Sequence, residues 1–103
     1  MNDIFSLKSK VIIFTGVGRG IGYNISAQLA KSGAYVYGID LKFLQPKKNL
    51  KNFFQLKCDV RNKKQFQKIC SKIYSKHKQI DILINNAGIT IPLKENGYYD
   101  DTN

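Results

Sequence analysis

The stretch IIFTGVGRGIG, from Ile12 to Gly22, contains the strongest local pattern in this chain of 103 residues. A short run of branched and aromatic apolar residues leads into four glycines at alternate positions, Gly16, Gly18, Gly20 and Gly22. An apolar run of this kind that ends at glycines is typical of a buried strand followed by a tight turn. We therefore predict a strand over 10–15, and a glycine turn that leads into a helix.

The residues that follow alternate between helical and strand patterns. Ile21, Ile25 and Leu29 are spaced four apart, with Ala27 and Ala30 beside them, which predicts a helix with one apolar face and a stop at Gly33. Further strands are predicted over 34–40, 53–58 and 80–85, and a second helix runs from a capping Asp59 to about residue 78. Strands that alternate with helices indicate an α/β fold, with a parallel sheet covered on both faces. The predicted inner face of the second helix carries Phe66, Ile69, Cys70 and Ile73.

The glycine turn departs from the general dinucleotide pattern G-x-G-x-x-G, but the form T-G-x-x-x-G-x-G can meet the same geometric needs. Gly16 would turn the chain away from the strand, Gly20 would let the backbone approach a pyrophosphate, and Gly22 would let helix and strand pack closely. The N–H groups and the positive dipole end at the helix start would then face the phosphates. The alternative is a glycine-rich turn that packs tightly and binds nothing.

Asp40 ends the second predicted strand, 24 residues after Gly16. A carboxylate there can accept hydrogen bonds from the adenosine ribose hydroxyls and would repel a 2′-phosphate, which favours NAD over NADP. Arg19 argues in the other direction, because an arginine in the glycine turn could pair with a 2′-phosphate. We expect NAD, since the charge of Asp40 lies where the phosphate would go.

Three motifs occur in order at the ends of the first, third and fourth predicted strands: TGVGRGIG (15–22), CDV (58–60) and NNAG (85–88). Together they resemble the single-domain branch of the short-chain dehydrogenase/reductase family, from about residue 7 to 90. The resemblance implies a Rossmann-like, doubly wound parallel sheet of about four strands in the order 3-2-1-4. It also implies an oxidoreductase that transfers hydride between a nicotinamide cofactor and a small-molecule alcohol or carbonyl substrate, such as a 3-oxoacyl group, a sugar or a polyol.

The resemblance also implies which residues bind the cofactor. They are Gly16, Arg19, Gly20, Ile21 and Gly22 along the pyrophosphate and adenosine side, Asp40 and Leu41 at the adenosine ribose, Asp59 and Val60 at the adenine edge, and Asn86, Ala87 and Gly88 beside the ribose near the nicotinamide.

The chain departs from the family in its catalytic residues. The family uses a Ser, a Tyr and a Lys, the last two spaced Y-x-x-x-K, well after the NNAG segment. The one such match, Tyr74 to Lys78, precedes NNAG, so we interpret Tyr74 as a packing residue and both Lys78 and His77 as cations that suit the end of a helix. We therefore expect no catalytic residue in residues 1–103, and interpret them as the N-terminal dinucleotide-binding portion of one Rossmann-type domain.

The fourth strand would then keep an unpaired edge, which promotes association. A homo-oligomer is expected only for the intact enzyme.

Charge and composition limit the partners. The net charge is +10, but Lys64, Lys68, Lys72 and Lys76 follow helical spacing and predict a solvated face, so we expect no nucleic-acid binding. We expect no membrane segment, because no run of 18 apolar residues occurs. The two cysteines lack metal-ligand spacing and indicate buried thiols in the cytoplasm. A non-catalytic nucleotide-binding module and an inactive gene fragment stay open as alternatives.

Overall fold

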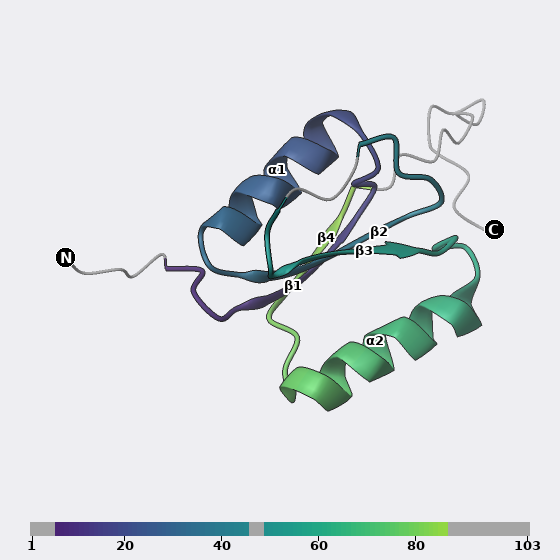
Figure 1. Cartoon of the computed structure of the whole chain (residues 1–103). Helices are drawn as coiled ribbons and strands as arrows, with labels where there is room; N and C mark the ends of the chain where they lie inside the picture. Colours follow the sequence, from purple (N-terminus) through teal and green to yellow (C-terminus); the bar gives the residue numbers. More distant parts are fainter. Residues whose placement is uncertain (1–5, 46–48, 87–103) are drawn as a thin grey trace, which may run out of the picture.

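The computed structural model describes residues 6–45 and 49–86, which form a parallel sheet and two helices (Figure 1). The strands lie in the order β3-β2-β1-β4, and each neighbouring pair is parallel. The predicted fold class and strand order are therefore confirmed. In chain order the elements are β1 (Val11–Thr15), α1 (Gly20–Lys31), β2 (Tyr35–Asp40), β3 (Phe53–Lys57), α2 (Lys63–His77) and β4 (Ile82–Asn85).

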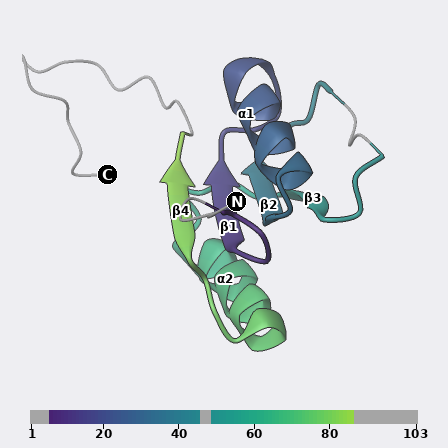
Figure 2. The ribbon, with the colours of Figure 1, turned by 90° about the vertical axis from the view of Figure 1, so that its left-hand side faces the viewer.

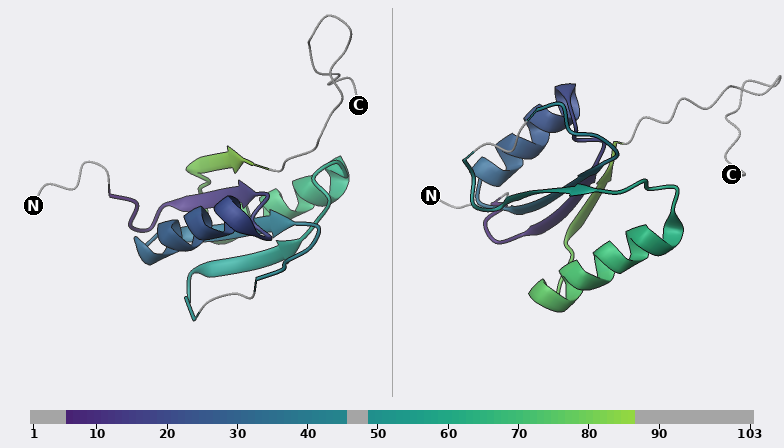
Figure 3. Two further views of the ribbon diagram at one scale, coloured as in Figure 1. Left: turned by 90° about the horizontal axis from the view of Figure 1, so that it is seen from above. Right: turned by 45° about the vertical axis from the view of Figure 1, so that its right-hand side comes forward.

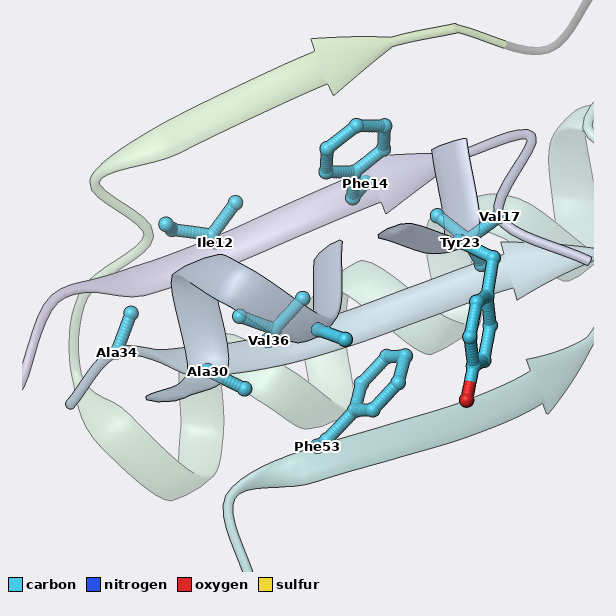
Figure 4. Close-up of a cluster of buried hydrophobic side chains, with 9 residues drawn as sticks. Ile12, Phe14, Val17, Tyr23, Ala30, Ala34, Val36 and Phe53 are labelled. Atoms are coloured by element: carbon cyan, nitrogen blue, oxygen red, sulfur yellow. The ribbon is translucent and has the colours of Figure 1, made fainter. Parts of the chain in front are cut away.

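The two helices cover opposite faces of the sheet, as Figures 1 and 2 show. Side chains alternate between the faces along a strand, so Ile12 and Phe14 of β1 pack under α1, while Val11 and Ile13 pack toward α2. All five residues of β1 are buried because this strand is central and covered on both sides. Figure 4 shows the side chains gathered between α1 and the sheet.

The buried face of α1 matches the predicted apolar face only in part. Ile21 and Ile25 are exposed, with exposed fractions of 75% and 45%, and Leu29 is half-buried. The sheet is contacted by a face of smaller side chains around Tyr23: Gly22, Ser26, Ala27 and Ala30. The prediction was therefore right for Ala27 and Ala30 and wrong for Ile21 and Ile25. The direction in which the glycine turn starts the helix selects its buried face. Small residues then let the helix approach the strands closely.

The start of α2 also differs from the prediction. Its N-cap is Asn62, whose side-chain oxygen accepts a hydrogen bond of 3.1 Å from the Gln65 N–H. Asp59 does not cap the helix, because its carboxylate instead accepts from the backbone and side chain of Arg61. The helix therefore begins at Lys63, one short turn later than a cap at Asp59 would allow.

The two faces of α2 follow the predicted period. Ile73 is buried, with Phe66, Ile69 and Cys70 packed beside it as half-buried neighbours. The outer face carries the four lysines Lys64, Lys68, Lys72 and Lys76, all exposed as predicted.

The end of α2 corrects two predictions, those for Tyr74 and His77. Tyr74 is 56% exposed, so it contributes little to the core. His77 contacts Tyr37 and Tyr35 instead of acting as a helix-end cation, and burial lowers its pKa. Lys78 lies at the helix end, where the prediction placed it, as a C-cap in the left-handed conformation.

Among the strands of residues 6–45 and 49–86, the edges of the sheet are β3 and β4 (Figure 3). Ile82 and Ile84 of β4 pack toward the α1 face, and Leu83, aligned with Ile13 of β1, lies on the α2 face and is 57% exposed. Within the described part of the chain, no helix is long and apolar enough to cross a membrane.

Candidate cofactor-binding site

A cavity of about 630 Å³ lies beyond the carboxyl ends of the strands, next to the point where the strand order reverses between β1 and β4. Ligands of open α/β sheets bind at this kind of switch point, and the volume lies within the range of about 300–1,000 Å³ usual for ligand sites. The lining residues are Gly16, Arg19, Gly20, Ile21, Gly22, Ile39, Asp40, Leu41, Cys58, Asp59, Val60, Arg61 and Asn86.

The glycine turn joins β1 to α1 with open space at Gly20 and close contact at Gly22. Gly20 has a φ of +63°, and a Cβ there would have no neighbour within 4 Å. A Cβ at Gly22 would lie 2.0 Å from the carbonyl oxygen of Gly16, so helix and turn can approach this closely only without a side chain. No side chain caps the start of α1, and its first turn has no acidic residue. The turn therefore presents uncapped helix N–H groups beside open space, an arrangement suited to an anion.

Hydrogen bonds from Thr15 connect the glycine turn to the segment after β4. The Thr15 hydroxyl donates to Asn85 Oδ1 at 3.0 Å and accepts from the Asn86 N–H at 3.0 Å. The Asn86 side-chain amide donates to the carbonyl of Gly16 at 3.3 Å. These bonds bring together residues about 70 positions apart and hold Gly16 and Asn86, which line the cavity, at the β1/β4 switch point.

The Asp40 carboxylate lies at the end of β2 and is held by backbone donors. Its Oδ2 accepts from the Gly18 N–H at 2.8 Å and its Oδ1 accepts from the Leu41 N–H at 2.7 Å. No cation forms an ion pair with it among the described residues. The carboxylate is therefore oriented by neutral groups, and no ion pair among the described residues offsets its charge at the cavity wall.

The Asp59 carboxylate, by contrast, is paired with a cation. The guanidinium of Arg61 donates to it from Nη2 at 2.8 Å and from Nε at 3.0 Å, and the Arg61 N–H adds a bond of 2.9 Å. These side-chain and backbone bonds lower the pKa of Asp59. The side chains of both residues remain partly open to solvent, so this is a surface ion pair, which contributes little to stability.

The sequence of this chain matches a family model described as short chain dehydrogenase over residues 10–102. The chain belongs to this family. It is 35% identical over 92 residues to a sorbitol-6-phosphate 2-dehydrogenase from Klebsiella pneumoniae, covering 89% of this chain and 34% of that protein. It is 30% identical over 91 residues to an NAD-dependent glycerol dehydrogenase from Listeria innocua, covering 84% of this chain and 36% of that protein.

A solved structure shares the fold. The ligand-free aldohexose dehydrogenase of Thermoplasma acidophilum superposes with a TM-score of 0.72 at 30% identity, covering 87% of this chain and 34% of that one. The chain thus spans about a third of the length of these short-chain dehydrogenase relatives.

Every described residue that the motifs assigned to the cofactor lines the cavity, and Ala87 and Gly88 lie outside the described residues. Sequence reasoning missed Ile39, Cys58 and Arg61 as lining residues. The sequence did offer a signal for each of them. Ile39 precedes Asp40, Cys58 is the first residue of the CDV motif, and Arg61 directly follows that motif. Burial raises the pKa of the Cys58 thiol, so this cysteine is not a ready nucleophile.

The Y-x-x-x-K match does not belong to the cavity. Tyr74 and Lys78 lie at the C-terminal end of α2, and neither residue lines it. Within the described residues, no three His, Cys, Asp or Glu side chains are grouped so that they could hold a metal ion.

Proposed function

We propose that residues 1–103 form the dinucleotide-binding portion of an NAD-dependent short-chain oxidoreductase. The intact enzyme would transfer hydride between the nicotinamide ring and an alcohol or carbonyl carbon. The observation that carries this proposal is one shared cavity, in which the glycine turn, Asp40, Asp59 and Asn86 meet at the β1/β4 switch point.

The residues present fit a dinucleotide. Open space beside Gly20 and the uncapped start of α1 suit a pyrophosphate, and Arg19 supplies a nearby cation. Asp40 and Leu41 would hold the adenosine ribose, Asp59 and Val60 the adenine edge, and Asn86, followed by Ala87 and Gly88, the ribose beside the nicotinamide. When bound, the cofactor would supply the hydride acceptor or donor, and these residues would only bind and orient it.

The charge of Asp40 supports NAD over NADP. Its carboxylate has no cationic partner in the described residues, so a 2′-phosphate placed beside it would meet an uncompensated like charge. The name of the Listeria innocua relative, which specifies NAD dependence, agrees with this choice. The names of all three relatives refer to polyhydroxylated compounds, which favours a sugar or polyol as the substrate of the intact enzyme.

Proton transfer would need groups other than those lining the described cavity. Asp59 is paired with Arg61 and its pKa is lowered, while burial raises the pKa of Cys58. We therefore propose that residues 1–103 bind the cofactor without catalysing turnover. The same observation favours a second candidate, a non-catalytic nucleotide-binding module, which would use the same site.

The proposal also includes a cytoplasmic location, supported by two free cysteines.

Calorimetric titration of the purified protein with NAD and NADP tests the binding proposal. We expect NAD to bind more tightly than NADP, and Asp40→Ala to weaken NAD binding by about tenfold, because a hydrogen bond to a charged group is lost. Absence of binding to either dinucleotide would overturn the proposal. Steady dehydrogenase turnover by the 103-residue protein, abolished by Asp40→Ala, would contradict the expectation that it does not catalyse by itself.

A further inference from the structure

Gly18 is the one glycine of the turn that has no role in the dinucleotide pattern. It nevertheless both donates and accepts hydrogen bonds with the end of β2 and the segment that follows. Its N–H donates to Asp40 Oδ2 at 2.8 Å. Its carbonyl accepts from the Leu44 N–H at 2.8 Å and, more weakly, from the Gln45 N–H at 3.4 Å. A single residue of the glycine turn therefore holds both the end of β2 and the segment that follows it.

The same segment leaves no space for a side chain at Gly18. This residue is buried, and a Cβ there would lie 1.9 Å from the carbonyl oxygen of Lys42 and 2.9 Å from Asp40 Oδ2. Because the nearer atom belongs to the backbone, it cannot turn aside as a flexible side chain would. Any larger residue at this position would have to push the Asp40–Leu44 segment away from the turn.

This packing determines where the charge of Asp40 lies. The Gly18 N–H holds Oδ2 and the Leu41 N–H holds Oδ1, so both oxygens are oriented. A carboxylate has about four acceptor positions, so both oxygens can still accept further hydrogen bonds from a ligand in the cavity. The orientation thus depends on the turn staying in contact with the segment after β2.

We propose that Gly18 is a positioning residue that sets the preference for NAD over NADP. By keeping residues 40–44 against the glycine turn, it holds the Asp40 carboxylate where ribose hydroxyls are accepted and a 2′-phosphate is repelled. This inference rests on the proposed dinucleotide-binding function. The inference adds that the preference for NAD over NADP depends on the contact between the glycine turn and residues 40–44. This preference is lost when the contact opens, even though Asp40 is still present.

Two measurements on the purified protein test this role: dissociation constants for NAD and NADP by calorimetry, and hydrogen exchange at the amides of Gly18 and Leu44. For Gly18→Ala we expect NAD binding to weaken by about tenfold while NADP binding changes less, because the hydrogen bond to the carboxylate is broken. We also expect faster exchange at Leu44, whose acceptor is displaced. Asp40→Asn retains an acceptor for Gly18, so it should lower the NAD preference and leave the exchange at Leu44 slow.

Gly33→Ala is the matched control for the cost of replacing a glycine. Gly33 has a φ of +99° and lies against Lys8, away from the cavity, so this variant should lower the melting temperature without changing the ratio of the two dissociation constants. A merely structural role of Gly18 predicts the same behaviour for Gly18→Ala. An unchanged NAD preference in Gly18→Ala would therefore overturn the inference.

The outcomes separate this inference from the proposed function. If the wild-type protein binds neither dinucleotide, the proposed function is wrong and the discrimination by Gly18 falls with it. If the wild-type protein prefers NAD and Gly18→Ala retains that preference, only the role of Gly18 is wrong. If Gly18→Ala does not fold, hydrogen exchange in Asp40→Ala provides the test. Faster exchange at the amides of both Gly18 and Leu44 would support the contact between the turn and the segment after β2. Unchanged exchange at Leu44 would overturn the inference.

Discussion

Asp40 and Asp59 are carboxylates that line the same cavity but differ in what neutralises them. Asp40 accepts only from backbone N–H groups among its described partners, whereas Asp59 is paired with the guanidinium of Arg61. An ion pair largely cancels the field of its carboxylate, while neutral donors leave the charge in place. The negative charge that a ligand would meet is therefore concentrated at the end of β2.

His77 is the only histidine of the chain, and it lies at the C-terminal end of α2 against two tyrosines. Its Nε2 is 2.7 Å from the Tyr37 hydroxyl, and its ring centroid is 4.8 Å from that of Tyr35. Burial, assisted by the neighbouring charge of Lys76, lowers the pKa of His77 below its ordinary value of 6.5. The unfolded chain therefore takes up this proton at a higher pH than the folded protein does.

We expect the free energy of unfolding to decrease as the pH falls through 6.5 toward the lower folded-state pKa of His77. Above 6.5 both states hold a neutral imidazole and the contribution is complete. Urea denaturation at a series of pH values between about 8 and 5, where histidine titrates, measures this change. His77→Gln can still bond to Tyr37 but does not titrate, so it should remove the decrease. An equal decrease in that variant would contradict this assignment.

At the scale of the elements, the two helices differ in how far their hydrophobic period predicts packing. The apolar positions of α2 face the sheet as their spacing indicates, with Ile73 3% exposed. In α1 the branched residues Ile21 and Ile25 face away, and Ala27 and Ala30 contact the strands. In α1 the close contact between Gly22 and the carbonyl of Gly16 sets the rotation of the helix, so the side that carries Gly22 and Ala30 faces the sheet.

Substitutions at two adjacent positions of α2 test its buried face. We expect Ile73→Ala to lower the free energy of unfolding by about 2–4 kcal/mol, because it leaves a cavity between α2 and the sheet. Tyr74→Ala should change it by less than about 0.5 kcal/mol, since that side chain is mostly exposed. Urea denaturation of both variants gives the comparison. Equal losses in the two proteins would mean that α2 packs in another orientation.

For the molecule as a whole, the least covered part of the described sheet is at β4. Among the described strands only β1 pairs with β4, and Leu83 projects from it with 57% of its surface exposed. An unpaired edge beside an apolar side chain favours association between molecules. The net charge of +10 opposes association, more strongly at low salt than at high salt.

We expect Leu83→Lys to shift the purified protein toward the monomer while leaving the free energy of unfolding nearly unchanged, because the replaced side chain is mostly exposed. Sedimentation velocity at rising salt concentration measures the association. Leu44→Lys adds the same charge to another exposed leucine, in the segment after β2, and is the matched control. Equal effects of the two substitutions would show that net charge, and not the edge at β4, governs association.

The sequence alone determined the architecture and which motif residues meet at one cavity. Buried strands and helices have distinct periods, and the motifs at the ends of β1, β3 and β4 meet because parallel strands all end at one edge of the sheet. Only the tertiary structure decided which face of α1 is buried, that Arg61 neutralises Asp59, and that Gly18 holds the segment after β2. These features depend on the rotation of a helix about its axis and on distances between separate segments. Local spacing along the chain does not encode either of them.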